Sequence, residues 1–296
     1  MTEAIVLLGK TGQLGRAVAA ALAGGDRPLV ALGRAELDLN NTANLTPQLA
    51  AYEPAWVINC AAYTAVDRAE QEPELAQQIN GRAPGLLAAA VAQIGARLIH
   101  ISTDYVFDGA QGRPYRESDP PNPLNVYGRS KWAGEQAILA AGGDRSLILR
   151  TSWLYGASGP GNFVTTMLRL GRERSEVRVV ADQVGSPTYA GDLAAVIRHL
   201  LTTDDISGLY HYSNSGVASW YDFAVAIFEE ARALAIPLQL ETVQPITTAE
   251  YPTAAQRPAY SVLASQALSQ RLGSPPPHWR TSLRQMLRPW RDLQNR

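Results

Sequence analysis

Cysteine, lysine and long hydrophobic runs are all scarce in this sequence of 296 residues. The single cysteine, Cys60, cannot form an internal disulfide, and a lone thiol within an apolar run is typical of a small buried side chain. No apolar run approaches the roughly 18 residues of a membrane-spanning helix. The apolar segment near the N-terminus lacks the basic flank of a signal peptide. We therefore expect a protein of the reducing cytoplasm that does not contact a membrane.

A surplus of positive charge is also missing. The chain carries 26 basic and 27 acidic residues, and its formal net charge is -1 at pH 7. This balance creates no long-range field that would steer the protein onto a polyanion. Basic residues do not alternate with aromatic ones, as they do in proteins that bind single strands. Nucleic acid is therefore not an expected partner.

Only two of the basic residues, Lys10 and Lys131, are lysines, and every other one is an arginine. An arginine supplies a fixed charge, whereas an amine combines a pKa that shifts readily with a compact donor. Each lysine is thus a candidate for chemistry that a guanidinium cannot perform. A chance survival of these two lysines stays open.

Ordinary apolar residues are plentiful, at 46% of the chain, so the sequence predicts a folded globular protein of one large or two modest domains. Short apolar runs without alternation, as in strands buried on both faces, recur in the first half. They lie at residues 4–8, 28–32, 56–60, 97–101 and 146–149, and helical patterns separate them at residues 14–22, 75–79 and 86–94. This order predicts an α/β fold of the Rossmann type with a doubly wound parallel sheet.

The alternation of predicted strands and helices ends at about residue 150, after which loops rich in glycine, serine and proline precede helical patterns. Those patterns cover residues 163–170, 193–201, 221–235 and 283–290. We expect a nucleotide-binding domain over residues 1–150 and a smaller mixed α/β domain over residues 151–296 that mainly binds substrate. Segments at about 175–216 are expected to return to the sheet.

Three glycines, Gly9, Gly12 and Gly15, stand between the first predicted strand and the first predicted helix. Small residues there let the backbone turn sharply and approach a pyrophosphate, and the helix N-terminus offers unpaired N–H groups to the anion. The spacing therefore predicts a dinucleotide site. A glycine turn without a ligand stays open.

Gly33 and Arg34 follow the second predicted strand, where enzymes that use NAD place a carboxylate for the ribose hydroxyls. A missing acid and a neighbouring guanidinium favour a ribose that carries a phosphate. The sequence thus predicts NADPH. The alternative, that Arg34 is an ordinary solvated side chain and NADH also serves, stays open.

Tyr127 and Lys131 are spaced by one helical turn, which places phenol and ammonium on one face. An ammonium near a phenol lowers its pKa and makes it a useful general acid, which is the chemistry of carbonyl reduction. Thr103 follows the strand predicted at 97–101, where its hydroxyl can hold a carbonyl oxygen. A solvated helix pair and an ordinary strand-end turn are the alternatives.

These motifs together resemble the extended short-chain dehydrogenase/reductase family, and more narrowly the dTDP-4-dehydrorhamnose reductases. The segments that carry the resemblance are residues 9–15, 59–67, 102–109, 123–131, 150–153, 182–188 and 257–258. It implies NADPH-dependent reduction of the C4 keto group of dTDP-4-dehydro-β-L-rhamnose to dTDP-L-rhamnose. Tyr127 would donate the proton, Lys131 would tune it and hold the nicotinamide ribose, and Thr103 would orient the keto oxygen.

The resemblance also implies the residues that contact each ligand. The cofactor residues are Gly9, Thr11, Gly12, Gln13, Leu14, Gly15, Arg34, Asp38, Leu39, Cys60, Ala61, Ala62 and Tyr63, together with Tyr127 and Lys131. The dTDP-sugar residues are Thr64, Val66, Asp67, Thr103, Asp104, Tyr105, Trp153, Asn162, Phe163 and Arg257. Arg257 would meet the diphosphate.

The sequence departs from the family at a metal site. Some members bind magnesium at a dimer interface through two acidic side chains, and the matching positions here are Ala17 and Gly191. Neither carries a side-chain oxygen for a hard cation. We expect no metal, and a monomer or a weak homodimer.

Two other functions stay open. The same scaffold could reduce or epimerise another nucleotide-linked sugar, because the base and sugar contacts decide that choice. A non-catalytic regulatory subunit, like the β-subunit of methionine adenosyltransferase, is the third hypothesis.

Overall fold

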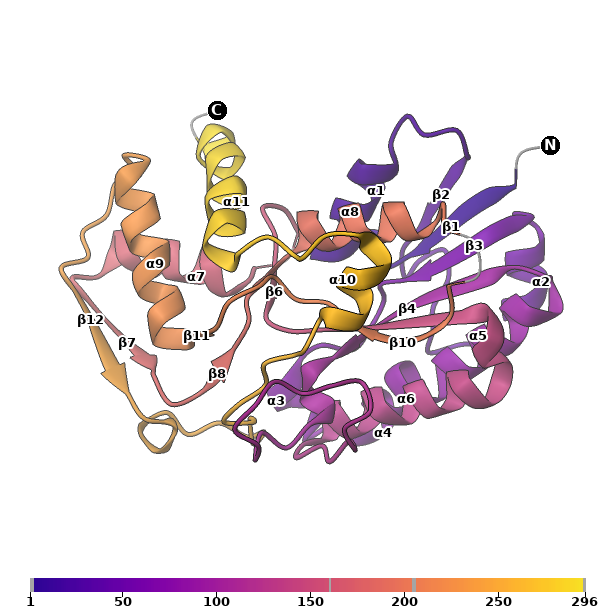
Figure 1. Cartoon of the computed structure of the whole chain (residues 1–296), viewed down its shortest axis with the longest axis horizontal. Coiled ribbons are helices and arrows are strands. Elements are labelled where there is room, and N and C mark those ends of the chain that lie inside the picture. Colours follow the sequence, from indigo (N-terminus) through magenta and orange to yellow (C-terminus); the bar gives the residue numbers. More distant parts are fainter. Residues whose placement is uncertain (1–2, 160, 204–205, 295–296) are drawn as a thin grey trace.

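A parallel sheet lies at the centre of the larger region of the molecule (Figure 1). The structure is a computed structural model and describes residues 3–159, 161–203 and 206–294. The strands of this sheet are β1 (Ala4–Leu8), β2 (Leu29–Leu32), β3 (Pro54–Asn59), β4 (Arg97–Thr103), β5 (Ser146–Thr151) and β10 (Gly208–His211). They follow the order β10-β5-β4-β3-β1-β2, and every neighbouring pair is parallel. The predicted Rossmann-type fold is confirmed.

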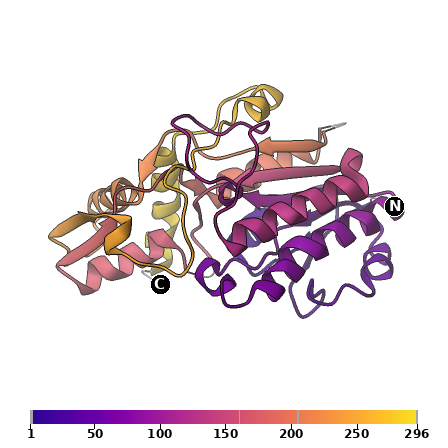
Figure 2. The ribbon, with the colours of Figure 1, turned by 90° about the horizontal axis from the view of Figure 1, so that it is seen from below.

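Helices cover both faces of the sheet, which explains the unbroken apolar runs of its strands. Helices α1 (Gln13–Leu22) and α8 (Ala190–Leu200) cover one face, and α2 (Leu45–Ala50), α5 (Ala83–Gln93) and α6 (Val126–Gly142) cover the other. Figure 2 shows α5 and α6 side by side along the sheet. Ile5 and Leu7 of β1 belong to the hydrophobic core between the sheet and helices α1 and α8. Val6 and Leu8 belong to the core on the opposite face, beneath α2, α5 and α6. Each side chain of this kind stabilises the fold by about 1.5–3 kcal/mol when it is buried.

The helical patterns predicted at residues 75–79 and 86–94 belong to one continuous helical segment. It consists of α4 (Pro73–Ala76), the π-helical turn η1 (Gln77–Arg82) and α5. Asn80 lies in the π turn, and its amide accepts from the N–H of Tyr63 at 2.8 Å and donates to the Tyr63 carbonyl at 2.9 Å. A π turn inside a helix often marks a functional site. Here it fixes the loop that follows β3.

A separate hydrophobic core lies in the smaller region of the molecule. It is formed by α7 (Phe163–Glu173), α9 (Trp220–Ala233) and α11 (Trp279–Gln294), packed against β7 (Glu176–Val180) and β12 (Thr242–Ile246). The helices predicted at 163–170, 221–235 and 283–290 are thus present. The remaining elements are α3 (Val66–Ala69), η2 (Asp104–Val106), η3 (Gly143–Arg145), β6 (Leu154–Tyr155), β8 (Val184–Gly185), β9 (Thr188–Tyr189), β11 (Ala218–Ser219), η4 (Thr248–Glu250) and α10 (Gln266–Leu272).

Two elements from the later part of the chain lie with the sheet. Strand β10 pairs with β5, with Gly208 opposite Leu147, and α8 packs on α1. The larger region is therefore not built from one continuous stretch of sequence. The domain division near residue 150 stays a prediction.

Candidate active site

The loop from β1 to α1 packs its three glycines against one another. Gly9 has a φ of +84°, which glycine adopts without strain. The N–H of Gly12 donates to the Gly9 carbonyl at 3.0 Å. A Cβ at Gly15 would collide with that same carbonyl oxygen, so no larger residue fits there. The tight turn itself therefore requires glycine at positions 9 and 15.

Helix α1 begins with donors that are open to an anion. Gly12 caps the helix without a side chain, and the first turn, from Gln13 to Gly15, contains no acidic residue. The first N–H groups of a helix have no partner within it and attract negative charge. These residues fit the pyrophosphate of a dinucleotide such as NADP.

The end of β2 holds a carboxylate that the sequence analysis missed. The Glu36 carboxylate accepts from Lys10 Nζ at 2.6 Å and from the Gly33 N–H at 2.8 Å. These two donors, with Lys10 the stronger, lower the pKa of Glu36. The exposed side chain of Arg34 lies beside this pair, 3.6 Å from Asp38. An acid that was expected to be absent is thus present near the end of β2, and it is already paired with a cation. Its position three residues after Gly33 was the one sign of it in the sequence.

The loop that follows β3 carries predicted residues for both ligands. Cys60 to Tyr63 come directly after the strand, and Asn80 holds Tyr63 as described above. Burial raises the pKa of the Cys60 thiol to about 12, so it is inert at neutral pH. Thr64 is exposed and Val66 begins α3.

Helix α6 starts where two side chains bind its first N–H groups. Asn125 Oδ1 accepts from the Gly128 N–H at 2.8 Å, and Glu70 accepts from the Val126 N–H at 2.7 Å. Such caps satisfy donors that the helix itself leaves free. They fix the first turn of α6, which carries Tyr127.

Glycine at position 128 lets this first turn approach η2 closely. A Cβ on Gly128 would collide with the Tyr105 carbonyl. The rings of Tyr105 and Tyr127 meet edge to face with centroids 5.6 Å apart. The Thr103 side chain interacts with the Tyr127 hydroxyl. The structure therefore brings the predicted proton donor and the predicted carbonyl-orienting residue together.

The acidity of Tyr127 differs from the prediction. Burial raises the pKa of Tyr127 to about 12, Thr103 opposes that rise, and Asp104 adds to it. The lowered pKa predicted from the neighbouring lysine is therefore wrong. The physical reason is that burial disfavours a phenolate, while the Lys131 amine is directed elsewhere.

Lys131 is almost completely buried, at 2% exposure. Its Nζ donates to the Ile101 carbonyl at 2.7 Å and lies 3.1 Å from His100 Nε2. Burial lowers the pKa of Lys131 to about 8. The alternative of a solvated Tyr127 and Lys131 helix pair is wrong, because neither side chain is exposed.

Asp104 sits beside Thr103 with an unusual carboxyl. Its Oδ1 accepts from the Thr103 hydroxyl at 3.1 Å. Its buried Oδ2 has no partner in good hydrogen-bond geometry among the described residues, and the Ser261 side chain lies near the carboxyl. Burial raises the pKa of Asp104 to about 6, although Ser261 and Thr103 act in the opposite direction. An orphaned buried oxygen next to the reacting groups is suited to a ligand hydroxyl.

Two predicted substrate residues, Asp67 and Arg257, bind each other. The guanidinium of Arg257 donates to both oxygens of Asp67, at 3.1 and 2.7 Å, and the Ala255 N–H donates to Asp67 at 3.0 Å. The hydrogen bond from Arg257 is the main reason that the pKa of Asp67 is lowered. Sequence spacing gave no sign of this pair, because 190 positions separate the partners.

Trp153 belongs to an aromatic cluster. Its backbone φ is +47°, a strained value for a bulky residue. Its ring stacks on the Trp220 ring, and the two ring centroids are 3.5 Å apart. Phe163 packs against Trp220 at 4.6 Å. Trp220 was missed by the sequence analysis, which treated its surroundings only as a helix.

Asn162 connects the two ligand regions. It caps α7 through Thr165, and its Nδ2 donates to Gln13 Oε1 and to the Gly156 carbonyl, both at 2.8 Å. Gln13 is the first residue of α1, at the predicted pyrophosphate site. A residue predicted to contact the sugar nucleotide thus touches a residue predicted to contact the cofactor.

These groups gather at the carboxyl ends of β1, β3, β4 and β5, where open α/β sheets bind their ligands. The chain matches the family model for the RmlD substrate binding domain over residues 2–291. It belongs to this family. The resemblance drawn from the motifs is confirmed.

Known proteins of this family resemble the chain over nearly its full length. A dTDP-4-dehydrorhamnose reductase of Burkholderia thailandensis is 44% identical over 286 residues, which cover 93% of this chain and 95% of that protein. The crystal structure of a dTDP-4-dehydrorhamnose reductase from Clostridium acetobutylicum has a TM-score of 0.91 at 39% identity, with 99% of both chains covered. One from Bacillus anthracis, in complex with NADP, has a TM-score of 0.91 at 40% identity and covers 97% of this chain and 99% of that chain.

The family's metal positions look different here. Asp192, next to Gly191, accepts hydrogen bonds from Asn214 and Ser282, at 2.7 and 2.5 Å. Within residues 3–159, 161–203 and 206–294 there is no group of three histidine, cysteine, aspartate or glutamate side chains that could hold a metal ion. The absence of a metal stays a prediction. In the same ranges, no helix has the length and apolar character to cross a membrane.

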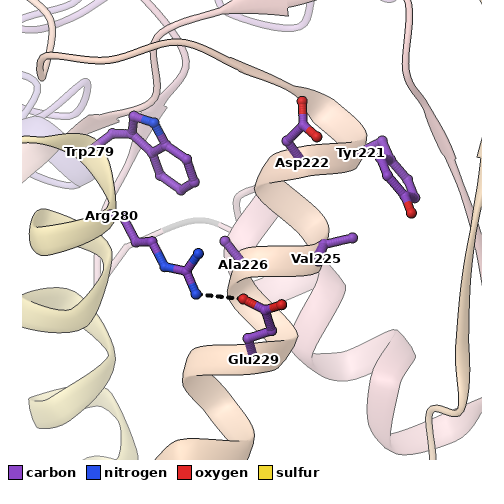
Figure 3. Close-up of a pocket in the computed structure, with 7 residues that line it drawn as sticks. All are labelled: Tyr221, Asp222, Val225, Ala226, Glu229, Trp279 and Arg280. Carbon is purple, nitrogen blue, oxygen red and sulfur yellow. Dashed lines mark hydrogen bonds and ion pairs between the residues drawn. The ribbon is translucent and has the colours of Figure 1, made fainter.

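A groove of about 230 Å³ lies between α9 and α11, away from all of these residues (Figure 3). Its charged side chains already have partners. Arg280 binds Glu229 at 2.5 Å, and Asp222 accepts from the Ser219 hydroxyl at 2.6 Å. The charged groups of the groove are therefore already engaged with one another or with the start of α9.

Proposed function

We propose that this protein reduces the C4 keto group of dTDP-4-dehydro-β-L-rhamnose with NADPH and releases dTDP-L-rhamnose. The observation that carries the proposal is the contact of Thr103 with the Tyr127 hydroxyl at the end of β4, with the Lys131 amine bound to the carbonyl of Ile101 in the same strand. Relatives that are dTDP-4-dehydrorhamnose reductases cover nearly the whole chain, which supports this substrate over other nucleotide sugars.

The residues of the chain fit an NADP-type cofactor. The glycine loop and the N-terminus of α1 would hold its pyrophosphate. Arg34 would pair with the phosphate on the ribose, and Lys10 could join it by leaving Glu36. When bound, NADPH supplies the hydride for the carbonyl carbon.

Tyr127 supplies the proton. As the carbonyl carbon accepts a hydride, its oxygen gains negative charge, and an alkoxide is a stronger base than a phenolate. A phenol with a pKa of about 12 holds its proton at neutral pH and so is ready to donate it. Thr103 would hold the same oxygen by a hydrogen bond, and an ammonium at Lys131 would stabilise the phenolate that forms.

The substrate side would hold the nucleotide and the sugar. Arg257 would bind the diphosphate after releasing Asp67, and Trp153 would cover the apolar side of the deoxysugar. The free oxygen of Asp104 would accept from a sugar hydroxyl. Asn162 would link this side to the cofactor through Gln13.

Oxidation of NADPH by purified protein, followed by its absorbance, tests the proposal. The dTDP-ketosugar should give turnover, and a Tyr127→Phe variant should not. A clear preference for UDP- or GDP-ketosugars would move the function to another nucleotide sugar. No turnover together with copurification of a partner enzyme would favour the regulatory subunit.

A cytoplasmic location and a monomeric or weakly dimeric state also belong to the proposal. The single cysteine, Cys60, cannot form an internal disulfide, which supports a reducing compartment. Light scattering after size-exclusion chromatography, with and without magnesium, tests the oligomeric state.

A further inference from the structure

A chain of hydrogen bonds runs from the backbone after β3 to Lys131. The Ala61 N–H lies 3.0 Å from Asn59 Oδ1, and Asn59 Nδ2 lies 3.0 Å from His100 Nδ1. His100 Nε2 in turn lies 3.1 Å from Lys131 Nζ. Asn59, His100 and Lys131 are at most 2% exposed, so water does not compete for these contacts.

The direction of every bond in this chain is fixed at the backbone. An amide N–H only donates, so the atom of Asn59 that faces Ala61 is the carbonyl oxygen. The side-chain NH₂ of Asn59 then faces His100 and must donate to Nδ1. His100 Nδ1 therefore carries no proton.

A neutral imidazole without a proton on Nδ1 carries it on Nε2, the atom that faces Lys131. An ammonium at Lys131 has no lone pair, so two donors would face each other at 3.1 Å. A neutral amine has one lone pair and can accept this hydrogen bond. Its own N–H still donates to the Ile101 carbonyl. Only the neutral amine satisfies the whole chain.

We infer that His100, oriented by Asn59, is a positioning residue that favours the uncharged amine of Lys131 over its ammonium. A second proton on His100 would not make room for an ammonium at Lys131. Both nitrogens of an imidazolium are donors, so one N–H would face the NH₂ of Asn59 and the other would face Lys131. The consequence for catalysis rests on the proposed reductase function, whereas the hydrogen-bond argument stands without it.

Other groups around Lys131 do not reverse this inference. Cys60 follows β3, and its raised pKa keeps it as a neutral thiol. Glu135 lies one turn further along α6, but its carboxylate is bound by Arg150 at 2.9 and 2.6 Å and by the Ser102 hydroxyl at 2.5 Å. Among the residues that the structure describes, Glu135 is the carboxylate that acts on Lys131, and its charge is thus already neutralised. Burial lowers the pKa of Lys131 and, together with Lys131, that of His100.

The inference agrees with the weak acidity of Tyr127. Burial raises the Tyr127 pKa, and an amine that loses its proton readily does little to lower it. The ammonium that helps the reaction would be favoured further when Nζ leaves His100 for other partners. We therefore expect kcat/KM to fall as the pH rises above about 8, where Lys131 loses its proton.

The scarcity of lysine makes a direct test practical. Protein labelled with ¹³C at lysine Cε should show one resonance for Lys10 and one for Lys131, and a Lys10→Arg variant assigns them. Without ligands, Lys131 should titrate near pH 8, about two units below the usual lysine value of about 10.4. A Lys131 resonance that titrates at about pH 10 or higher would overturn the inference.

Two substitutions at position 59 test the role of the tautomer. In Asn59→Asp, a carboxylate can only accept, so His100 would carry its proton on Nδ1 and offer a lone pair to Lys131. In Asn59→Leu, nothing forces the proton onto Nε2. Both variants should raise the pKa of Lys131, the aspartate by about one unit or more, while Lys10 stays unchanged as the internal control. A rise with aspartate alone would mean that added charge, not the tautomer, is responsible, which would overturn the role given to His100.

Kinetics separates positioning from mere support. In Asn59→Leu the basic limb of the kcat/KM profile should move to higher pH together with the Lys131 titration. A variant that lowers the whole profile without moving the limb would show a structural role only. An inactive protein whose Lys131 still titrates near pH 8 would refute the proposed function and leave this inference intact.

Discussion

The two halves of the candidate site are held in different ways. Tyr127, Lys131 and Thr103 sit on the first turns of α6 and the end of β4, and their positions follow from helix caps and strand pairing. On the substrate side, Asp67 and Arg257 hold each other. The proposed reacting groups are thus fixed by the frame of the fold, whereas the proposed substrate-binding groups are held in place by one another.

The burial of the ion pairs on each side shows the same difference. Arg150 and Glu135, beneath Lys131, are both 3% exposed, and loss of one partner in such a pair costs about 3–5 kcal/mol. Arg257 and Asp67 are 21% and 45% exposed, where a pair contributes about 0–1 kcal/mol. If the diphosphate binds Arg257 as proposed, it would displace Asp67 at little cost, while the buried pair beneath Lys131 would stay in place.

The largest effect is expected at the reacting groups. Tyr127→Phe removes the proton donor and leaves the ring, so kcat/KM should fall by about 10²–10⁴-fold. NADPH affinity, measured by fluorescence titration, should stay within about threefold because the helix frame is unchanged. Activity within about tenfold of the parent protein would mean that another group supplies the proton.

Asp104 directly follows Thr103 at the end of β4, and the rise of its pKa on folding lowers the free energy of unfolding at neutral pH. An unfolded aspartate titrates at about 3.9, whereas burial raises the pKa of Asp104 to about 6 in the folded protein. The folded state therefore binds this proton more tightly, and stability falls as the pH rises through that window. Two units correspond to about 3 kcal/mol.

Asp104→Asn should accordingly be more stable than the parent protein at about pH 8, by up to about 3 kcal/mol, and equally stable at about pH 3.5. Urea unfolding at the two pH values measures the difference. Asp108→Asn is the matched control, because the pKa of Asp108 is lowered by hydrogen bonds that Ala110 and other donors make, so this change should destabilise at about pH 8. An equal effect of Asp104→Asn at both pH values would contradict the prediction.

Substitution of Arg257 tests the proposed substrate side of the site. Arg257→Met should raise KM for the dTDP-sugar by about 10–100-fold, because hydrogen bonds to charged groups contribute about 1.5–3 kcal/mol, while kcat changes less. The free energy of unfolding should change by no more than about 1 kcal/mol. Arg178→Met breaks another exposed pair, with Glu250, and should leave KM unchanged. A loss confined to kcat would place Arg257 with the reacting groups instead.

The smallest effect is expected at Arg34, the most exposed of these residues. Arg34→Ala should lower the ratio of kcat/KM for NADPH to that for NADH by about tenfold, since one charge-assisted contact is lost. Arg169→Ala, on the exposed face of α7, is the control for loss of a surface arginine. A ratio that does not change would assign the phosphate to Lys10.

Much of the fold was predictable because its causes are local. The apolar runs predicted five of the six strands of the main sheet within a few residues, and the glycine spacing located the turn before α1. The spacing of Tyr127 and Lys131 likewise placed both side chains on one helix. The sixth strand, β10, carries no comparable run, and its pairing with β5 depends on contacts across the fold.

The missed residues share one physical cause. Glu36, Trp220 and His100 gain their roles from partners that are distant in sequence, such as Lys10, Trp153 and Lys131. The error about Tyr127 has the same origin, because its pKa depends on burial and on the direction in which the Lys131 amine points. No one-dimensional spacing contains this information.

The sequence by itself therefore determined which elements form and which residue types stand at the ends of the strands, because hydrophobic period, glycine spacing and helical spacing act over a few positions. The tertiary structure alone decided the partners and the charge of each group in the site. Burial and the fixed direction of hydrogen bonds set that charge, and both arise only when distant segments pack together.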